Sequence, residues 1–389
     1  MRTVIIGNGG AAVESVVALR GGGNDSEIHL FSDSAFPALN PTLLTYYIAG
    51  KMGFEDLFPF DGDIYRRYEV KLHLGSRVTQ LDAVNKTVEN DAKVKMSYDN
   101  CIVCSGAGPV IPKRYQDRAV YTIRSAQDAI SLKKQISEGK KALVVGASMV
   151  GIKVVEALAG NGVEVTLTDT QDHVFPLTSH ARCSALIERR LLELGIHLEL
   201  ATDNPDLSWY DIIVVCVGVT PNIGFIDKTQ IDTDNGILID RFMRTSCEGL
   251  YAAGDCARIR ASGSGSLAPG LWASARYMGR TAGNNIAGKN EACFEVVRHN
   301  STRVFDMDFS SIGDISQGDD IFEMESRGKY CMISRKEDQI MGINLLNMPE
   351  ISGILKSQTI SSQGLSAITM GKVFGRHPRI RKAFLERGA

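Results

Sequence analysis

Two cysteines in the first third of the chain have the spacing of a thiol-disulfide redox centre. They are Cys101 and Cys104, in the segment YDNCIVCSGAGP. A catalytic pair of this kind needs a helix N-terminus that lowers the pKa of its thiol. The apolar residues around these cysteines instead predict a strand, in which side chains three positions apart point to opposite faces of the sheet. The sequence therefore predicts two thiols in the core of a strand, with no disulfide between them.

A glycine-rich turn near the N-terminus has the spacing of a dinucleotide-binding fingerprint. In GNGGAA, Gly7, Gly9 and Ala12 form the pattern G-x-G-x-x-A. Glycine allows a tight turn and lets the backbone approach a pyrophosphate, whose charge the N-terminus of the next helix stabilises. The alternative is an ordinary glycine turn. Neighbouring candidates for the same nucleotide are Gly10 and Ala11 in the turn, and Ser32 or Asp33 at the ribose hydroxyls.

A second turn, GASMVG, has Gly146 and Gly151 but carries Ser148 where the middle glycine of the fingerprint belongs. A serine side chain at that place must fit beside the phosphates and can hydrogen-bond one of them. Asp169 closes the strand that follows, where a carboxylate accepts from the 2'-hydroxyl of NAD and repels the 2'-phosphate of NADP. The sequence therefore favours NAD over NADP. Further candidates for contacts in this turn are Met149 and Val150.

The elements that must position these turns recur about 140 residues apart. The sequence predicts a strand, a glycine turn and a helix over residues 3–22, and a second strand over residues 27–33. Residues 141–169 repeat this order of elements. Two such units predict an α/β protein with two parallel-sheet nucleotide domains. From about residue 291, short strands and turns predict a third, smaller domain, followed by a basic tail. That tail is interpreted as a solvated terminal helix or as a docking site for an acidic electron-transfer protein.

Composition excludes several classes of function. The 43 Lys and Arg nearly balance the 45 Asp and Glu, so no nucleic-acid or membrane partner is expected. The eight cysteines are scattered along a long chain, which favours reduced thiols, and neither a signal peptide nor a membrane span is predicted. We therefore expect a cytoplasmic protein. The seven histidines have no metal-ligand spacing, and no metal site is predicted.

Together with the segment GLYAAGDCA, the two nucleotide units resemble the FAD-dependent pyridine nucleotide-disulfide oxidoreductase superfamily. PALNPTLLTYYIAGK and HNSTRVFDMDFSSIGD resemble its branch of rubredoxin and ferredoxin reductases, NADH oxidases and the flavoprotein part of nitrite reductase. The resemblance covers about residues 1–350. It implies two Rossmann-like, glutathione-reductase-like domains plus a small C-terminal α+β domain. The implied boundaries are 1–113 with 241–290 for FAD, 114–240 for NAD(H), and 291–389 for a C-terminal interface domain.

The resemblance also assigns residues to the two cofactors. Asp255 would hydrogen-bond the ribityl chain or a phosphate of FAD, and Val78 would meet the adenine through its backbone. Leu271 and Trp272 would place a helix N-terminus at the pyrimidine edge of the flavin, where negative charge gathers on reduction. Trp272 can equally be a core aromatic, and Asp255 a helix cap. Further candidates are Asn40, Ser105, Gly106 and Gly254 at FAD, and Gly218 at NAD(H).

Lys153 is the candidate catalytic residue. Several ferredoxin reductases carry a glutamate at this position, paired with a lysine at the position that matches Thr45. A cation here, near the flavin and the nicotinamide, would steady hydride transfer. The alternative is a solvated lysine on a helix.

The resemblance further implies the type of reaction, whose physiological direction the sequence leaves open. Disulfide-reducing relatives carry their reactive cysteine near PALNPTLLTYY, which contains none here. Electrons are therefore expected to pass between NAD(H) and, through FAD, an external iron-sulfur or rubredoxin-type protein. The alternatives are an NADH oxidase that reduces oxygen at the flavin, and a non-catalytic flavoprotein subunit or NADH sensor. The C-terminal domain would form a homodimer contact or attach the chain to a complex.

Overall fold

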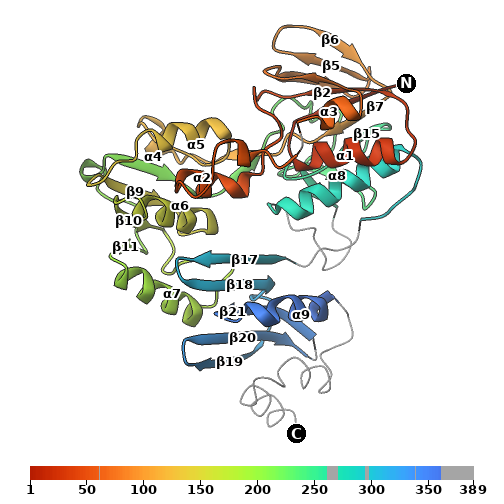
Figure 1. Ribbon diagram of the computed structural model, residues 1–389. Helices are drawn as coiled ribbons and strands as arrows, with labels where there is room; N and C mark the ends of the chain where they lie inside the picture. Colours follow the sequence, from red (N-terminus) through yellow and green to blue (C-terminus); the bar gives the residue numbers. More distant parts are fainter. Residues whose placement is uncertain (61, 261–269, 294–297, 338, 361–389) are drawn as a thin grey trace. The chain divides into compact units, whose positions relative to one another are not determined.

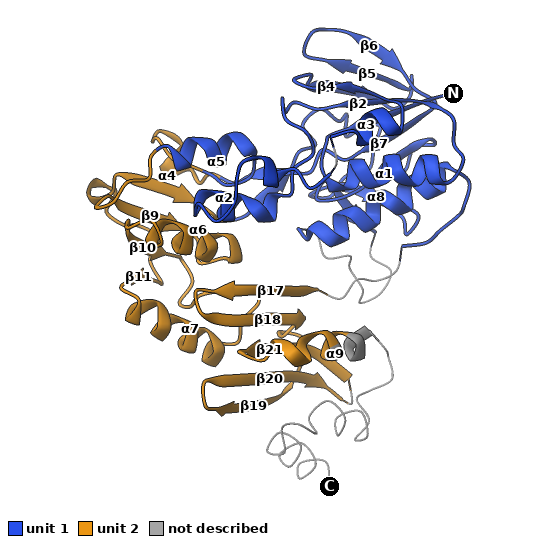
Figure 2. Cartoon of the chain, viewed as in Figure 1, with its two compact units in different colours: residues 1–110, 122–134, 218–296 blue, residues 111–121, 135–217, 297–389 orange. Residues whose placement is uncertain are grey.

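A computed structural model describes residues 1–389 except 61, 261–269, 294–297, 338 and 361–389. The basic tail considered above lies outside the described residues. The chain divides into two compact units (Figure 2). Unit 1 comprises residues 1–110, 122–134 and 218–296, and unit 2 comprises residues 111–121, 135–217 and 297–389. The division into an FAD-binding, an NAD(H)-binding and a C-terminal domain stays a prediction.

Unit 1 is built on a five-stranded parallel sheet with the order β15-β7-β1-β2-β3. Four of its five strands are short and mostly buried, as expected for a sheet covered on both faces, and the edge strand β3 is more exposed. The sheet strands are β1 (Arg2–Ile6), β2 (Glu27–Phe31), β3 (Val70–His73), β7 (Asn100–Val103) and β15 (Leu250–Ala252). Because β1 lies between β2 and β7, the turn that follows β1 is at the point where the strand order reverses. Ligands of open α/β sheets bind at such points.

Two helices pack side by side along unit 1, α1 (Gly10–Gly21) and α8 (Trp272–Ile286) (Figure 1). Their backbones approach closely because α8 carries glycines at the contact. A Cβ at Gly279 would lie 2.0 Å from the carbonyl oxygen of Ala11. The position of α1, and of the turn before it, therefore depends on α8.

Smaller elements complete unit 1. An antiparallel three-stranded sheet has the order β4-β5-β6, and the pairs β8-β13 and β14-β16 are separate. The strands are β4 (Val78–Asp82), β5 (Thr87–Asn90), β6 (Lys95–Ser97), β8 (Ala107–Pro109), β13 (Val219–Pro221), β14 (Ile237–Ile239) and β16 (Ala257–Ile259). The helices are η1 (Pro41–Leu43), α2 (Leu44–Ile48), η2 (Glu55–Leu57), α3 (Ile64–Arg67) and α5 (Ala126–Lys133).

Unit 2 repeats the parallel design with a four-stranded sheet of order β11-β10-β9-β12. Its strands are β9 (Lys141–Val145), β10 (Glu164–Thr168), β11 (His197–Glu199) and β12 (Ile212–Val215). Its helices are α4 (Lys113–Gln116), α6 (Met149–Ala159), α7 (Ala181–Glu193) and η3 (Leu207–Trp209). The turn after β9 again lies where the strand order reverses, because β9 is flanked by β10 and β12.

Unit 2 also contains a five-stranded antiparallel sheet of order β17-β18-β21-β20-β19, against which α9 (Pro349–Ile360) packs. Its strands are β17 (His299–Val304), β18 (Met307–Gly313), β19 (Asp320–Ser326), β20 (Lys329–Lys336) and β21 (Gln339–Leu346). Phe309 stacks on Phe175, with 4.9 Å between the ring centroids. The fully buried Asn344 accepts from the backbone N–H of His180 at 2.6 Å and donates to the carbonyl of Thr178 at 2.8 Å. These contacts attach the antiparallel sheet to the rest of the unit.

The predicted α/β class with two parallel sheets and a further small sheet is confirmed. Among the helices of the described ranges, none has both the length and the apolar character needed to cross a bilayer.

Candidate functional site

The first glycine turn, between β1 and α1, is open on one side. Gly7 has a φ of +106°, and a Cβ there would lie 2.2 Å from the carbonyl oxygen of Cys104, so only glycine fits. A Cβ at Gly9 would meet nothing within 4 Å. Gly9 is also the N-cap of α1, and no side chain caps that helix. The turn therefore offers uncapped N–H groups and free space, which is what a phosphate group requires.

The two ribose candidates follow β2 and differ in exposure. The Ser32 hydroxyl is buried and accepts a hydrogen bond from the backbone N–H of Ser34 at 3.2 Å. Asp33 is exposed. Of the two, Asp33 has its acceptor oxygens available for ribose hydroxyls.

Asp255 follows Gly254 after β15 and is held by two donors. Its carboxylate accepts from the guanidinium of Arg124 at 2.5 Å and from the backbone N–H of Gly270 at 3.1 Å. Arg124 also donates to the carbonyl of Ala107 at 2.9 Å. The Asp255 side chain is 13% exposed and that of Arg124 is 30% exposed. Sequence reasoning missed Arg124, whose only local signal is that it precedes the capping box at the start of α5.

Ser105 and Gly106 join β7 to β8 and are tied to Asn222. The Ser105 hydroxyl donates to the carbonyl of Asn222 at 2.7 Å, and the Asn222 side chain donates back to the carbonyl of Ser105 at 3.1 Å. The backbone N–H of Asn222 donates to the carbonyl of Gly106 at 3.0 Å. The Ser105 hydroxyl is thus already engaged within the protein.

The N-terminus of α8 lies beside the first glycine turn. A Cβ at Gly10 would approach within 2.8 Å of the Trp272 indole. Leu271 is the N-cap of α8, which likewise has no side-chain cap. Trp272 also faces the ring of Phe60, with 6.0 Å between centroids. The start of α8 thus contacts the first glycine turn through the Trp272 side chain, and neither α1 nor α8 has a side-chain cap.

Asn40 and Val78 lie elsewhere in unit 1. The Asn40 side chain accepts from the backbone N–H of Thr42 at 3.1 Å and caps η1. Val78 is buried at the first position of β4, beside an irregularity in the pairing with β5. Their roles at FAD stay predictions.

The second glycine turn, between β9 and α6, has the same geometry as the first. Gly146 has a φ of +107°, and a Cβ there would lie 2.6 Å from the carbonyl oxygen of Cys216. A Cβ at Gly151 would lie 1.9 Å from the carbonyl oxygen of Gly146. The Ser148 hydroxyl accepts from the N–H of Gly151 at 3.2 Å and donates to the carbonyl of Cys216 at 3.0 Å. Ser148 therefore caps α6 and uses its hydroxyl inside the protein.

Asp169 supports this second turn from the end of β10. Its carboxylate accepts from the backbone N–H of Ala147 at 2.7 Å and from that of Gln171 at 2.9 Å. The Thr170 hydroxyl donates to the same carboxylate at 3.5 Å. A carboxylate offers about four acceptor positions, so one remains for a ribose hydroxyl. Beside it, Met149 and Val150 begin α6, where Val150 is 46% exposed.

The two remaining candidates, Gly218 and Lys153, make contacts outside the second glycine turn. Gly218 has a φ of +121°, accepts from the N–H of Val110 at 3.0 Å and belongs to unit 1. The Lys153 ammonium contacts the Glu156 carboxylate at 2.5 Å and donates to the carbonyl of Arg303 at 3.0 Å. Its side chain is 14% exposed, so the alternative of a solvated lysine is wrong. A catalytic role of Lys153, and a role of Gly218 at NAD(H), stay predictions.

The strand interpretation of the C-x-x-C pair is confirmed. Cys101 lies in β7, Cys104 follows it, and both are buried and free. Burial raises the pKa of both thiols, which keeps them protonated. Among the described residues, no three His, Cys, Asp or Glu side chains are arranged to hold a metal ion.

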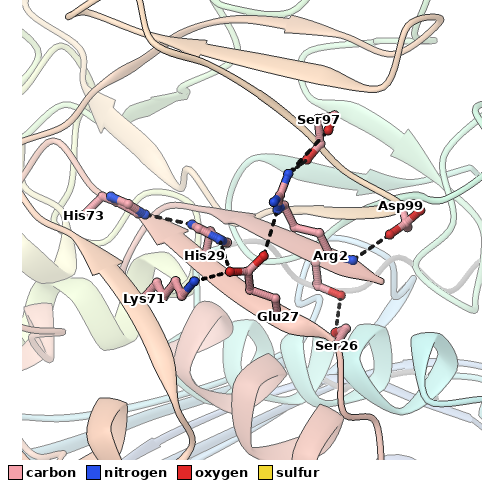
Figure 3. Close-up of polar contacts among 9 residues, drawn as sticks. Arg2, Ser26, Glu27, His29, Lys71, His73, Ser97 and Asp99 are labelled. Carbon is pink, nitrogen blue, oxygen red and sulfur yellow. Dashed lines mark hydrogen bonds and ion pairs between the residues drawn. The ribbon is translucent and has the colours of Figure 1, made fainter.

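A cluster of titratable groups lies on β2 and β3 (Figure 3). Nδ1 of His29 is 3.0 Å from Nε2 of His73, and the other nitrogen of His29 is 3.4 Å from the Glu27 carboxylate. Lys71 and Arg2 also pair with Glu27 and hold the pKa of its carboxyl at about 2. Burial lowers the pKa of both histidines.

Two parallel sheets, each with a glycine turn at its reversal point, define a class of α/β protein that binds two dinucleotides. The family model described as pyridine nucleotide-disulphide oxidoreductase matches residues 1–279. The chain belongs to this family of oxidoreductases, and the predicted family is confirmed.

Relatives extend the comparison over most of the chain. The chain is 24% identical over 373 residues to NADH-rubredoxin oxidoreductase of Clostridium acetobutylicum, covering 95% of this chain and 97% of the relative. It is 26% identical over 341 residues to NADH oxidase of Methanocaldococcus jannaschii, covering 80% and 76%. The crystal structure of the covalent putidaredoxin reductase-putidaredoxin complex superposes with a TM-score of 0.85 at 21% identity, over 92% of this chain and 93% of that one. That likeness establishes the fold.

Proposed function

We propose that the chain is an NADH-dependent flavoprotein that transfers electrons, through FAD bound in unit 1, to a small rubredoxin-type or ferredoxin-type protein. The observation that carries the proposal is the pair of glycine turns of matching geometry, one in each unit, in a member of this family. The relative named NADH-rubredoxin oxidoreductase, matched over nearly its whole length, supports this choice of acceptor.

The residues of unit 1 fit FAD. The open side of the turn at Gly9 and the uncapped starts of α1 and α8 suit the negative charge of a pyrophosphate and of a reduced flavin. Asp33 would accept from ribose hydroxyls, and Asp255, oriented by Arg124, would face the ribityl chain or a phosphate. Bound FAD supplies two-electron exchange with a nicotinamide and one-electron exchange with an acceptor. The protein contributes binding and orientation.

The residues of unit 2 fit NAD(H). The turn at Gly146 leads into α6, which Ser148 caps, and Asp169 holds the turn while keeping an acceptor position for a ribose. A 2'-phosphate would bring further negative charge beside Asp169. We therefore expect NADH to be preferred over NADPH.

The burial of the cysteine thiols supports an electron acceptor outside this chain. All eight cysteines lie in the described ranges, and all but the half-buried Cys247 are buried. Cys104 and Cys216 contact the glycine turns through their backbone carbonyls. Burial raises the pKa of Cys216 to about 12. Burial also raises the pKa of Cys104 well above its usual range. Neither thiol is suited to exchange with a substrate disulfide.

The test is an anaerobic titration of the flavin-loaded protein with NADH and with NADPH. The flavin absorbance should bleach with about one equivalent of NADH and respond poorly to NADPH. Mixing the reduced protein with rubredoxins and ferredoxins should then restore the absorbance within the mixing time. A chain that stays colourless and takes up no flavin would contradict the proposal. Bleaching that no acceptor reverses would instead indicate an NADH sensor or a non-catalytic subunit.

A second candidate function is NADH oxidase, which the Methanocaldococcus jannaschii relative supports. The distinguishing measurement is oxygen consumption by the flavin-loaded protein with NADH and no added carrier. Consumption as fast as the reduction of the best carrier protein would favour the oxidase.

The assembly proposed for the C-terminal part is a homodimer or a subunit contact through residues 291–389. The described part of that region contains the antiparallel sheet of unit 2 and α9. Light scattering of the full chain over a hundredfold range of concentration tests it. A monomer throughout, alone and with the carrier protein, would exclude the dimer.

A further inference from the structure

A single phenol hydroxyl joins the first glycine turn of unit 1 to the loop that follows β2. Tyr65, on α3, donates a hydrogen bond to the side-chain oxygen of Asn8 at 2.8 Å. The same hydroxyl accepts from the backbone N–H of Ala38 at 3.1 Å. Asn8 lies inside the turn, between Gly7 and Gly9. Ala38 lies in the loop of residues 32–40, which we call the β2–η1 loop.

The donor and acceptor roles at this bridge are fixed by chemistry. A backbone N–H can only donate, so the phenol oxygen is the acceptor from Ala38. The single proton of the phenol then points to Asn8, whose contacting atom must be the carbonyl oxygen of its amide. Burial raises the pKa of Tyr65, whose residue is 9% exposed, so the proton stays on the hydroxyl. The bridge is therefore intact around neutral pH.

The orientation of the Asn8 amide leaves one of its hydrogen-bonding atoms without a partner among the described residues. Its nitrogen Nδ2 is buried and has no partner in the part of the chain that the structure describes. Buried donors are seldom left in that state, so the arrangement is not the one that stability alone selects. An amide held in this way fixes the position of the turn relative to the β2–η1 loop.

This loop carries residues of the proposed FAD site. Ser32 and Asp33 begin it, and Asn40 ends it. Its start is anchored to the segment after β3, since Gly75 donates to the carbonyl of Ser34 at 3.0 Å. Its end is anchored to η2, since Asn40 donates through its backbone to the carbonyl of Leu57 at 2.9 Å. The Tyr65 bridge ties the stretch between these anchors to the turn.

We infer that Tyr65 and Asn8 are positioning residues for FAD, which hold the β2–η1 loop at the glycine turn before the cofactor binds. The inference rests on the proposed function, because it presumes that FAD occupies unit 1. When the loop is already ordered, FAD binding does not have to order it, so loss of the bridge should weaken FAD binding. One neutral hydrogen bond corresponds to about a 3- to 10-fold change in affinity.

The test compares Tyr65→Phe with Tyr98→Phe in the full-length apoprotein. Tyr98 is a matched control: it is buried in the same unit, 5% exposed, and its hydroxyl has no partner in the described ranges. Tyr65→Phe should raise the dissociation constant of FAD about 3- to 10-fold, measured by quenching of flavin fluorescence. Tyr98→Phe should leave it unchanged. Amide hydrogen exchange of residues 32–40 in the apoprotein should rise in Tyr65→Phe alone.

Four outcomes would contradict the proposal, and each identifies the step that is wrong. If the wild-type apoprotein binds no FAD, the proposed function fails. If the wild type binds FAD and Tyr65→Phe binds it equally well, only the positioning role fails. If both tyrosine variants weaken binding alike, the effect comes from loss of any buried hydroxyl in unit 1, and the bridge has no special role. A lower melting temperature of Tyr65→Phe with unchanged FAD affinity would mark the bridge as a stabilising contact only.

Discussion

Replacement of Gly279 by alanine should destabilise unit 1, although the same change usually stabilises a helix. Gly279 lies in the interior of α8, where alanine is ordinarily favoured over glycine by about 1 kcal/mol. Here a Cβ would lie 2.0 Å from the carbonyl oxygen of Ala11 and 2.7 Å from its Cα. Both atoms belong to the backbone of α1, so no side chain can rotate away.

The size of the effect follows from this overlap. To restore an ordinary contact of 3.4 Å, the two helices must separate by roughly 1.4 Å at this point. Overpacking of this kind costs about 1 to 3 kcal/mol, and the separated helices also lose contacts along their length. We expect a net loss of about 3 kcal/mol. For a unit of this size, that loss lowers the melting temperature by roughly 6 to 12 °C.

The assay is thermal and urea unfolding of the apoprotein, with Gly21→Ala as the matched control. Gly21 is the last residue of α1, and a Cβ there would meet nothing within 4 Å. Gly21→Ala should be neutral or stabilising by up to about 1 kcal/mol. If Gly279→Ala were as stable as the wild type, α1 and α8 would not pack as closely as described, and the dependence of the glycine turn on α8 would be refuted.

Three further predictions concern other parts of the chain. Burial lowers the pKa of His29 and His73 below the ordinary 6.5, so the unfolded chain takes up protons at a higher pH than the folded chain does. The free energy of unfolding measured in urea should therefore fall as the pH drops below about 6.5, and His73→Phe should make this fall less steep. Asn344→Ala leaves two backbone groups unpaired and should destabilise unit 2 by about 2 to 4 kcal/mol in thermal unfolding; an unchanged melting curve would exclude its anchoring role. Ellman's reagent should modify Cys101 and Cys104 only after denaturation, and rapid labelling of either thiol in the native protein would show that β7 is not closed.

The parts of the fold that sequence could predict are those set by local rules. The turn glycines Gly7 and Gly146 follow apolar strands and adopt a positive φ that other residues avoid, so their pattern marks the turn directly. The alternation of side chains along a strand placed Cys101 and Cys104 correctly in the core of unit 1. In each case the information lies within about ten residues of sequence.

The parts that sequence could not predict depend on contacts between distant segments. Arg124 and Asp255 are 131 positions apart, and Asn8 and Tyr65 are 57 apart. No local pattern marks an arginine or a tyrosine as the partner of one particular residue, because the partner is chosen by tertiary packing. Lys153 shows the same limit: its position on α6 was evident, whereas its contact with the β17 backbone at Arg303 required the structure.

The middle residues of the two turns differ in a way that agrees with the two proposed ligands. At Gly9 no side chain caps α1, so its first N–H groups have no side-chain acceptor until an anion binds. At Ser148 the hydroxyl already accepts from the N–H of Gly151, so the start of α6 is partly satisfied without a ligand. An anion at the first turn therefore adds more hydrogen bonding than one at the second. Tight retention suits a flavin that stays on the protein through every turnover, and weaker holding suits a nicotinamide nucleotide that must leave after each one.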